Sequence, residues 1–506
     1  MLKKMRDDPL SQLEQVDMLQ RLGLSYHFEK EIESIMKAIS TNHTWNKTNL
    51  HAAALEFRLL RQHRYHLEPQ DVFNIFKDDT GNFKACLGDD VMGLLSLYEA
   101  SFHLKQGEII LEEARDFTTK HLQRFMNNTK DDQDYQFLLV SHALELQLHW
   151  RVPRIEARWF IDVYEIKRDM NPTLLELAKL DFNVVQQKHQ EELKHLARWW
   201  KDTGLVQKLN YSRDRMVECF IWTMGCAFEP DFEYCRIMIT KLSSFLTVVD
   251  DTYDVYGTLD ELELFTDIAK RWDVNAVDQI QNYMKILFLS LYNFTNELAL
   301  DVLKEQDLHI FKYLNKIFAD CFRCYILEVR WYHSGHVPTF QEYIENGLIT
   351  LGIPLLASVA YCCLSKQSIK EEVLEFVVQY PNIMRQAALI SRLANDLSTS
   401  SFELQRGHPP SSIQCYMHEN GVSEDEARQY IKNFINEIWK KMNEERDAAS
   451  LLTNRFIDML MDVARISMWM YEKGDGFGFQ NQCNTKEGIL SLFINPIHMG
   501  YKNQED

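Results

Sequence analysis

The pattern of apolar residues along this chain is helical almost from end to end. Apolar positions recur at intervals of three and four, as on one face of an α-helix. Met238, Leu242, Phe245 and Val249 are one such series. No segment alternates apolar and polar residues for long enough to predict a strand. The pattern therefore predicts an all-α protein.

Length and composition agree with this class and divide the chain. A chain of 506 residues is longer than a single hydrophobic core usually supports. It contains only 18 Gly and 11 Pro, so few residues are present that break helices. The sequence Lys201-Asp202-Thr203-Gly204 interrupts two helical patterns. We therefore expect two helical domains, an N-terminal one over residues 1–205 and a C-terminal one over residues 206–506.

An acidic cluster follows directly on the apolar series described above. It reads Asp250-Asp251-Thr252-Tyr253-Asp254. On a continuing helix Asp250 and Asp254 share a face. Stacked carboxylates beside an apolar face suit a hard cation such as Mg²⁺, which commonly bridges to substrate phosphates. Taken alone, the cluster also fits a solvated helix end.

A second group of oxygen-bearing residues lies 145 positions further along. Asn395, Thr399 and Glu403 are spaced at i, i+4 and i+8 and form one stripe on a helix. Asp396 is turned away from that stripe, so we expect it to support the ligands rather than to bind metal itself. Arg392 lies three residues before Asn395 and adds a cation on the same face. Two such stripes on separate helices suit Mg²⁺ ions that hold a diphosphate.

A third element precedes the acidic cluster by 35 residues. Arg213 and Arg215 offer guanidinium groups, which bind phosphate oxygens in pairs. Ser212 is a candidate N-cap of the helix that follows. Trp222 lies two helical turns beyond Arg215, where its ring could face a developing positive charge.

Together these elements resemble a plant class I terpene synthase: a DDxxD motif, a later NDxxTxxxE motif and an upstream RxR. Within that family the sequence is most similar to the angiosperm monoterpene synthase branch. The resemblance extends over the whole chain. Further similar stretches are Arg21-Leu22-Gly23-Leu24, Phe57-Arg58-Leu59-Leu60-Arg61, Leu97-Tyr98-Glu99-Ala100, His149-Trp150-Arg151, 158–165, 254–258 and 414–417.

The resemblance implies an N-terminal α-barrel-like domain and a C-terminal helical bundle with the active site in its centre. It implies a lyase that ionises an allylic prenyl diphosphate, most naturally geranyl diphosphate, to a monoterpene and diphosphate. Three Mg²⁺ ions, or Mn²⁺, are expected. The implied metal ligands are Asp250, Asp254, Asn395, Thr399 and Glu403. Asp250, Asp251 and Asp254 are the implied catalytic residues, and Arg213, Arg215, Trp222, Asp250, Asp254, Arg392 and Asn395 the implied substrate-binding residues.

Three features bear on the product. Many relatives carry a tandem arginine followed by a tryptophan near the mature N-terminus, and no such motif is found before Leu19. Relatives often have Lys where this chain has Ser411. From both we expect mostly acyclic or simple monocyclic products. No DxDD motif is present, which argues against a protonation-initiated reaction, and family likeness places Asp475-Gly476 in a loop over the cavity mouth.

Small residues near the motifs predict the substrate length. Ser243 and Ser391 are expected to lie below the metal ligands, with Thr247 and Ala388 on the same faces. In isoprene-forming members the matching serine positions carry Phe. We therefore expect room for ten carbons rather than five, with Trp222 limiting the depth.

The remaining composition narrows the partners. A net charge of −19 argues against nucleic acid. The sequence contains no run of 18 apolar residues, so it predicts no membrane-spanning helix. The ten cysteines show no metal-binding spacing beyond a lone CxxC at Cys321 and Cys324, so free thiols are expected. We expect a monomer or weak homodimer, in the plastid if a transit peptide has been removed, or else in the cytoplasm.

Three other functions remain open on the sequence. The first is a sesquiterpene synthase acting on farnesyl diphosphate. The second is a chain-elongating isoprenyl diphosphate synthase, although that family carries two aspartate-rich motifs where this chain has Asn, Thr and Glu. The third is an inactive homologue that serves as a scaffold.

Overall fold

The computed structural model describes residues 8–41, 48–129, 131–364, 369–405, 409–449, 451–472, 474 and 483–499, with backbone only at 401–405 and 483–487. Within these residues the regular secondary structure is helical, and one isolated bridge joins Lys77 to Phe83. The predicted all-α class is confirmed. The chain forms two compact units, residues 1–186 with 446–448 and 494–506, and residues 187–445 with 449–493.

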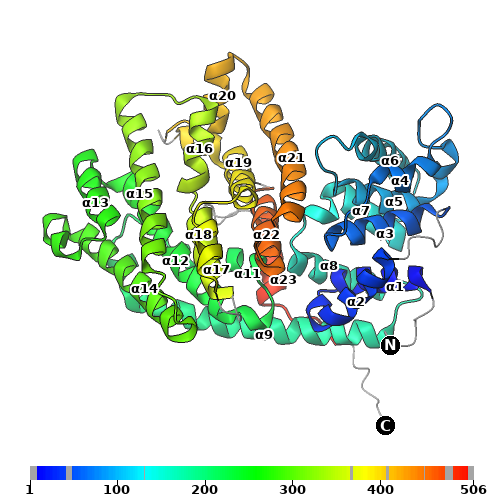
Figure 1. Ribbon diagram of the computed structural model, residues 1–506, viewed down its shortest axis with the longest axis horizontal. Coiled ribbons are helices and arrows are strands. Elements are labelled where there is room, and N and C mark those ends of the chain that lie inside the picture. Colours follow the sequence, from blue (N-terminus) through cyan, green and yellow to red (C-terminus); the bar gives the residue numbers. More distant parts are fainter. Residues whose placement is uncertain are drawn as a thin grey trace, which may run out of the picture. The chain divides into compact units, whose positions relative to one another are not determined.

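The helices of the N-terminal half are short, apart from α6 and α9 (Figure 1). Their bounds are α1 Pro9–Arg21, α2 Glu29–Ser40, α3 Leu50–Gln62, α4 Pro69–Phe73, α5 Val91–Ser101, α6 Ile109–Asn128, α7 Tyr135–Glu145, α8 Pro153–Glu165 and α9 Pro172–Thr203. Helix α5 packs against α3, α6 and α7, and α1 packs against α3 and α8. Apolar side chains such as Phe57, Phe73 and Leu97 fill the space between them.

The C-terminal half begins beyond Gly204, whose φ of +67° ends α9. The α-helices are α10 Leu205–Lys208, α11 Met216–Cys226, α12 Glu233–Asp251, α13 Leu259–Arg271, α14 Asn282–Gln306, α15 Phe311–Ser334, α16 Phe340–Thr350, α17 Ile353–Leu364, α18 Glu371–Val377, α19 Asn382–Gln405, α20 Ser412–Asn420, α21 Glu424–Ala448, α22 Asn454–Tyr471 and α23 Cys483–Phe493. The proposed boundary at residues 205/206 stays a prediction, since α9 itself continues from the first compact unit into the second.

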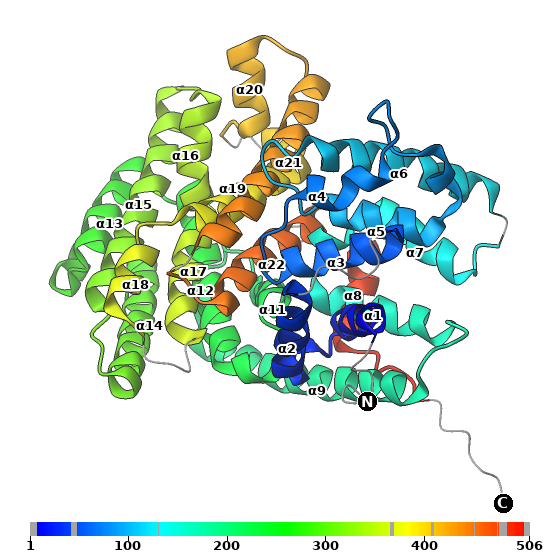
Figure 2. The same cartoon turned by 45° about the vertical axis from the view of Figure 1, so that its right-hand side comes forward.

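Six helices of the second unit pack in a closed sequence of neighbours. Helix α11 contacts α12, α12 contacts α17, α17 contacts α16, α16 contacts α19, α19 contacts α22, and α22 contacts α11 again. Helix α15 adds to this wall through α16 and α17 (Figure 2). A closed ring of helices with apolar inner faces is well suited to enclose a cavity.

Two segments of this unit are long and apolar enough by composition to cross a membrane, Asn282–Gln306 and Phe340–Leu364. In the second, 72% of the most apolar window is buried inside the protein, as is usual for a core helix. That segment is also divided, since Gly352 has φ +81° and separates α16 from α17.

Candidate active site

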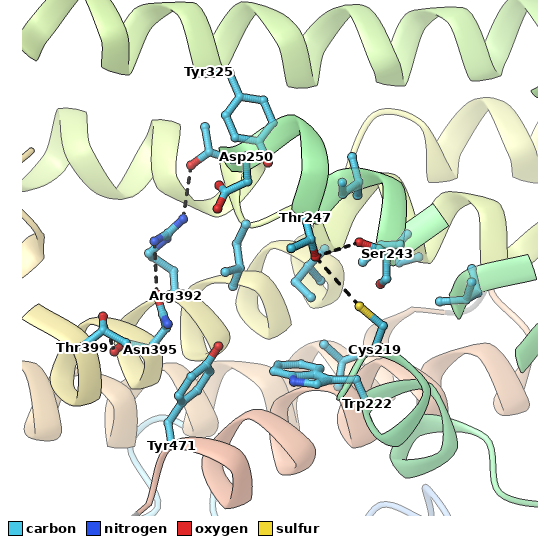
Figure 3. A pocket seen from close by; sticks show the side chains of 18 of the residues that line it. Cys219, Trp222, Ser243, Thr247, Asp250, Tyr325, Arg392, Asn395, Thr399 and Tyr471 are labelled. Carbon is cyan, nitrogen blue, oxygen red and sulfur yellow. Dashed lines mark hydrogen bonds between the residues drawn. The ribbon is translucent and has the colours of Figure 1, made fainter. Parts of the chain in front are cut away.

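The ring of helices encloses a cavity of about 270 Å³ (Figure 3). Its polar end carries side chains from α12, α15, α16 and α19, and its apolar end carries side chains from α11, α12, α17 and α22. The polar residues at the first end include Arg213, Asp250, Asp254, Glu328, Thr350, Arg392, Asn395, Thr399 and Ser411. Cys219, Trp222, Ser243, Thr247, Leu356, Met459 and Tyr471 are among the residues that line the rest.

Asp250 and Asp254 both line the cavity, but the helix between them changes form. Helix α12 ends at Asp251, and residues Thr252–Tyr256 form a π-helical turn. The amide of Gly257 accordingly donates to the carbonyl of Thr252, five residues back. The prediction that α-helix continues through the motif is therefore wrong in detail. The two carboxylates still face one cavity, because a single wider turn keeps positions four apart on a similar face. Such turns are frequent at functional sites.

Asp251 and Arg213 form a clamp beside these carboxylates. Asp251 is 3% exposed and does not line the cavity. It accepts bonds from the Arg213 Nε at 2.7 Å, the Arg213 amide at 2.7 Å and the Ser212 hydroxyl at 3.2 Å. The other arm of Arg213, Nη2, lies 2.8 Å from Asp250 Oδ2. Asp251 therefore supports the site by holding Arg213 against Asp250.

The structure corrects the predicted N-cap. Helix α11 begins at Met216 with Arg215 as its N-cap, so Ser212 caps nothing and instead donates to Asp251. Arg215 lies 3.7 Å from Glu218 and is not among the residues that line the cavity. Asp214 accepts a bond from the indole of Trp200 at 2.9 Å, which anchors this segment. The binding role predicted for Arg215 stays a prediction.

Helix α19 brings the second stripe to the opposite wall. Asn395 and Thr399 line the cavity, and the Thr399 hydroxyl donates to the Asn395 carbonyl at 3.1 Å. Arg392 donates from Nη1 to Asn395 Oδ1 at 3.3 Å (Figure 3). The side chain of Glu403, and the Asp475-Gly476 segment predicted to cover the mouth, lie outside the described residues.

Asp396 and Ser411 shape the wall beside this stripe. Asp396 is 1% exposed and accepts bonds from the Tyr343 hydroxyl and the Ser412 amide, both at 3.1 Å. Ser411 is the N-cap of α20 and forms a capping box with Gln414. A lysine at 411 would lose this cap, because it has no short side-chain acceptor for the helix amides.

Carboxylates outnumber guanidinium groups at the polar end of the cavity. Burial, followed by the charge of Asp250 and that of Glu328, raises the pKa of Asp254 well above its usual value. Because the Asp254 side chain still reaches solvent, we attribute much of this shift to the like charges. Asp250 and Asp251 raise the pKa of Arg213 despite its desolvation. Within the described residues no three His, Cys, Asp or Glu side chains form a metal cage by themselves.

Family comparisons agree with these motifs. Residues 201–441 match the terpene synthase family metal binding domain, and residues 1–144 match the terpene synthase N-terminal domain. A myrcene synthase of Quercus ilex, described as chloroplastic, is 53% identical, covering 97% of this chain and 82% of its own. An (-)-alpha-terpineol synthase of Vitis vinifera is 51% identical, covering 97% and 83%.

The chain belongs to the terpene synthase family.

Solved structures extend this conclusion to three dimensions. A limonene synthase bound to 2-fluorolinalyl diphosphate is 40% identical with a TM-score of 0.94, covering 98% of this chain and 92% of that one. An isoprene synthase of Populus x canescens, solved with three Mg²⁺ ions and dimethylallyl-S-thiolodiphosphate, is 42% identical with a TM-score of 0.91, covering 98% and 94%. This terpene synthase therefore has the class I fold and is a carbon–oxygen lyase, as the sequence predicted.

One charged residue of this terpene synthase was missed on the sequence. Glu328 lies on α15 at the cavity wall and accepts bonds from Asn346 and Thr350, both at 2.9 Å. Burial raises its pKa, which the nearby Arg392 opposes. A signal was present, because Glu328 follows Cys321 and Tyr325 on the buried face of its helix. A carboxylate among buried apolar positions needs a specific partner.

The predicted position of one serine in this terpene synthase is wrong. Ser243 and Thr247 line the cavity as expected. Ser391 does not line it; it is fully buried between α19 and α22, where it shares a hydrogen bond of 2.6 Å with Ser467. Ala388, likewise fully buried, is also absent from the cavity wall. Small residues on α19 thus serve close packing of helices rather than pocket depth.

Proposed function

We propose that this protein is a magnesium-dependent monoterpene synthase that ionises geranyl diphosphate. One observation carries the proposal: the polar ends of α12 and α19 face the same cavity, whose remaining wall is apolar and aromatic. Asp250 and Asp254 contribute from one side, and Asn395 and Thr399 from the other. This arrangement fits a substrate with a polyanionic head and a hydrocarbon tail.

The donor set fits Mg²⁺. Asp250 and Asp254 would hold ions at one wall, and Asn395, Thr399 and Glu403 at the other, all through the oxygen ligands that Mg²⁺ prefers. The excess of carboxylates over guanidinium groups at this end favours added positive charge. When bound, the ions neutralise the diphosphate and stabilise it as a leaving group.

The chain's own cations would position the same group. Arg392 and Arg213 line the cavity on different walls, so each can donate N–H groups to phosphate oxygens. Trp222, whose ring centre lies 6.2 Å from that of Tyr471, presents an aromatic surface where an allylic cation would lie. Fixed donors and an apolar wall favour charge separation at the polar end.

Ten carbons suit the cavity better than five or fifteen. Ser243 and Thr247 leave room below the carboxylates, and Trp222 and Tyr471 close the space from α11 and α22. The relatives that make myrcene, which is acyclic, or terpineol and limonene, which are monocyclic, support a ten-carbon substrate. With Ser411 in place of Lys, we expect acyclic or simple monocyclic products here.

Location and assembly complete the proposal. Several related myrcene synthases are described as chloroplastic, which supports a plastid location for this protein. We expect it to act as a monomer or weak homodimer on a small-molecule substrate.

One experiment tests the proposal. Purified protein with Mg²⁺ is supplied in turn with dimethylallyl, geranyl and farnesyl diphosphate, and volatile products are identified by gas chromatography–mass spectrometry. We expect the highest kcat/KM with geranyl diphosphate. A higher value with farnesyl diphosphate would make it a sesquiterpene synthase. A longer diphosphate formed on adding isopentenyl diphosphate would indicate chain elongation, and no turnover of any substrate would indicate a scaffold.

A further inference from the structure

Arg392 is held by a neighbouring helix as well as by its own. Its Nε donates to the carbonyl of Gly347 at 3.2 Å, and its Nη2 donates to the hydroxyl oxygen of Thr350 at 3.3 Å. Both acceptors lie in α16, whereas Arg392 itself lies in α19. Three different nitrogen atoms therefore have acceptors, because Nη1 donates to Asn395.

The Thr350 hydroxyl accepts from Arg392 and has Glu328 as its nearer acceptor, since its other acceptor, the Gly347 carbonyl, lies at 3.5 Å. A guanidinium can donate but cannot accept, so the Thr350 oxygen must accept from Arg392. Its own proton then points elsewhere, and Glu328 Oε1 lies 2.9 Å away as the acceptor. Asn346 donates to the same Glu328 oxygen at 2.9 Å. The result is a directed chain from Arg392 through Thr350 to Glu328.

Burial shields this chain of hydrogen bonds from water. Thr350 is 2% exposed and Asn346 is 5% exposed, so water does not compete freely for their bonds. Gly347 lies directly against the arginine side chain, because a Cβ at that position would lie 3.4 Å from both Cγ and Nε of Arg392, at the near limit of ordinary contact. The contribution of Gly347 is therefore its carbonyl, which accepts from Nε of Arg392.

We infer that Thr350 is a positioning residue for the reaction, which acts by orienting Arg392 toward the diphosphate. The inference rests on the proposed function. Arg392 alone has a long, flexible side chain, and Thr350 with Gly347 and Glu328 fixes its plane at the cavity wall. A group that is already oriented stabilises the leaving diphosphate without reorganising when charge develops.

Conservative variants distinguish this role from simple packing. Thr350→Val keeps the shape and removes the hydroxyl, whereas Thr350→Ser keeps the hydroxyl and removes a methyl group. Thr295→Val is the matched control. Thr295 is also a fully buried helical threonine of the same unit, and its hydroxyl bonds to the carbonyl of Leu291 in its own helix.

The measurements are kcat and KM for geranyl diphosphate with Mg²⁺, and the dissociation constant of inorganic diphosphate with Mg²⁺ by calorimetry. We expect Thr350→Val to lower kcat about tenfold, the scale of one hydrogen bond to a charged group, and to weaken diphosphate binding. Thr350→Ser keeps the hydroxyl, so its kcat and its diphosphate binding should stay within about twofold of wild type. Thr295→Val should leave both unchanged.

A double-mutant cycle with Arg392→Ala completes the test. If Thr350 acts through Arg392, adding Thr350→Val to Arg392→Ala lowers kcat no further. A full tenfold loss in that background, or a Thr350→Val protein that behaves like the Thr295→Val control, would overturn the inference. Absence of turnover in the wild type would instead refute the proposed function, and diphosphate binding by the variants would still decide the role of Thr350.

Discussion

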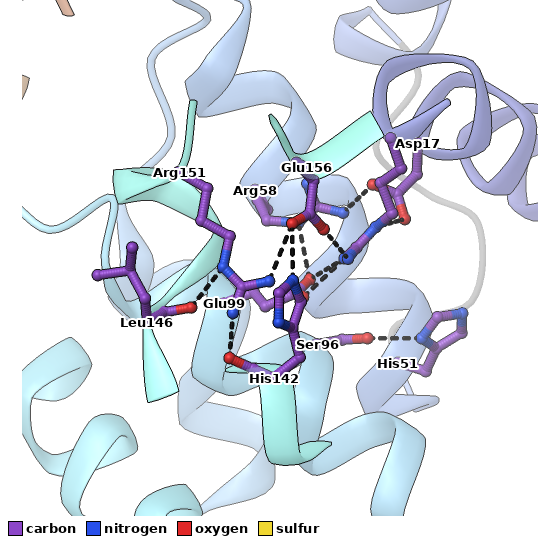
Figure 4. A network of polar contacts seen from close by, with 10 residues as sticks. Asp17, His51, Arg58, Ser96, Glu99, His142, Leu146, Arg151 and Glu156 are labelled. Carbon is purple, nitrogen blue, oxygen red and sulfur yellow. Dashed lines mark hydrogen bonds and ion pairs between the residues drawn. The ribbon is translucent and has the colours of Figure 1, made fainter. Parts of the chain in front are cut away.

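Two clusters of arginines and carboxylates in this protein behave in opposite ways. In the first unit Arg58 and Arg151 meet Asp17, Glu99 and Glu156 (Figure 4). Arg21 joins them through pairs with Asp17 and Glu99. Contacts are close, at 3.0 Å between Arg21 and Asp17 and 2.9 Å between Arg151 and Glu156. Three cations balance three anions, and Arg58, Glu99, Arg151 and Glu156 are each less than 9% exposed.

The second cluster lies at the polar end of the cavity, where carboxylates outnumber guanidinium groups. There burial and the charges of Asp250 and Glu328 raise the pKa of Asp254, and burial raises that of Glu328. In the first cluster, by contrast, Arg21 and Arg58 outweigh burial and lower the pKa of Asp17 to about 2. Charges that satisfy one another hold a fold together, whereas like charges kept side by side at a cavity indicate a site for an added cation.

The sharpest way to break this comparison is to remove a carboxylate from the cavity. We expect Asp250→Asn to lower kcat/KM by roughly a thousandfold, since a lost metal ligand raises the barrier by several kcal/mol. The thermal midpoint should stay within a few degrees of wild type. Near-normal turnover in this variant, or in wild type with a chelator, would rule out the metal assignment.

Removing an arginine from the first cluster should have the converse effect. Arg58→Ala leaves Asp17 and Glu99 buried without one partner, which costs about 3–5 kcal/mol of unfolding free energy. Turnover per folded molecule should not change. Arg158→Ala is the control, since its pair with the exposed Asp162 is worth less than about 1 kcal/mol. Equal losses of unfolding free energy in the two variants would show that the buried network stabilises the fold no more than an exposed ion pair does.

Arg392 tests whether a cavity arginine works for binding rather than folding. We expect Arg392→Ala to lower kcat/KM. The loss should correspond to about 1.5–3 kcal/mol of transition-state stabilisation. Denaturant unfolding measured in parallel should change less than for Arg58→Ala. An unchanged kcat/KM in soluble protein would make Arg392 an ordinary structural charge.

Acid should weaken the first cluster in a defined range. A carboxylate with a lowered pKa stabilises the fold above its unfolded pKa of about 4, and this contribution is lost as pH falls toward 2. For Asp17 it amounts to roughly 2 kcal/mol. Unfolding free energy from denaturant titrations should therefore fall less steeply below pH 4 in Asp17→Asn than in wild type. Parallel curves would contradict the assignment.

The last comparison concerns substrate length. Ser243→Phe should fill space in the cavity and shift preference from geranyl toward dimethylallyl diphosphate by about 1–3 kcal/mol. Ser391→Phe should instead disturb the α19–α22 packing and lower stability. If Ser391→Phe changes substrate preference and Ser243→Phe does not, the assignment of the two serines is reversed.

Spacing along single helices was enough to predict which residues of one helix line the cavity together. Asn395 and Thr399, four apart on α19, line one cavity because one helical turn separates them. The same holds for Ser243 and Thr247 on α12. Such relations depend only on local geometry, which the order of residues specifies.

Relations between helices could not be predicted in this way. Spacing from the metal ligands predicted that Ser391 and Ser243 both line the cavity. Ser391 instead faces α22, because of how α19 is rotated in the ring. Glu328 became part of the site only when α15 and α16 packed together. The Ser212 side chain bonds Asp251, 39 residues away, instead of capping the next helix.

The sequence by itself determined the helices, the chemistry of their polar stripes and the family. Arg21, Arg58, Glu99 and Arg151 lie in four motifs far apart in the chain, and the sequence marks each of them only as a family likeness. Tertiary structure alone decided that they form one buried network while Arg392 reaches Thr350 beside a cavity. The physical reason is that pairing and desolvation depend on distance in space, which helix packing sets and local spacing does not.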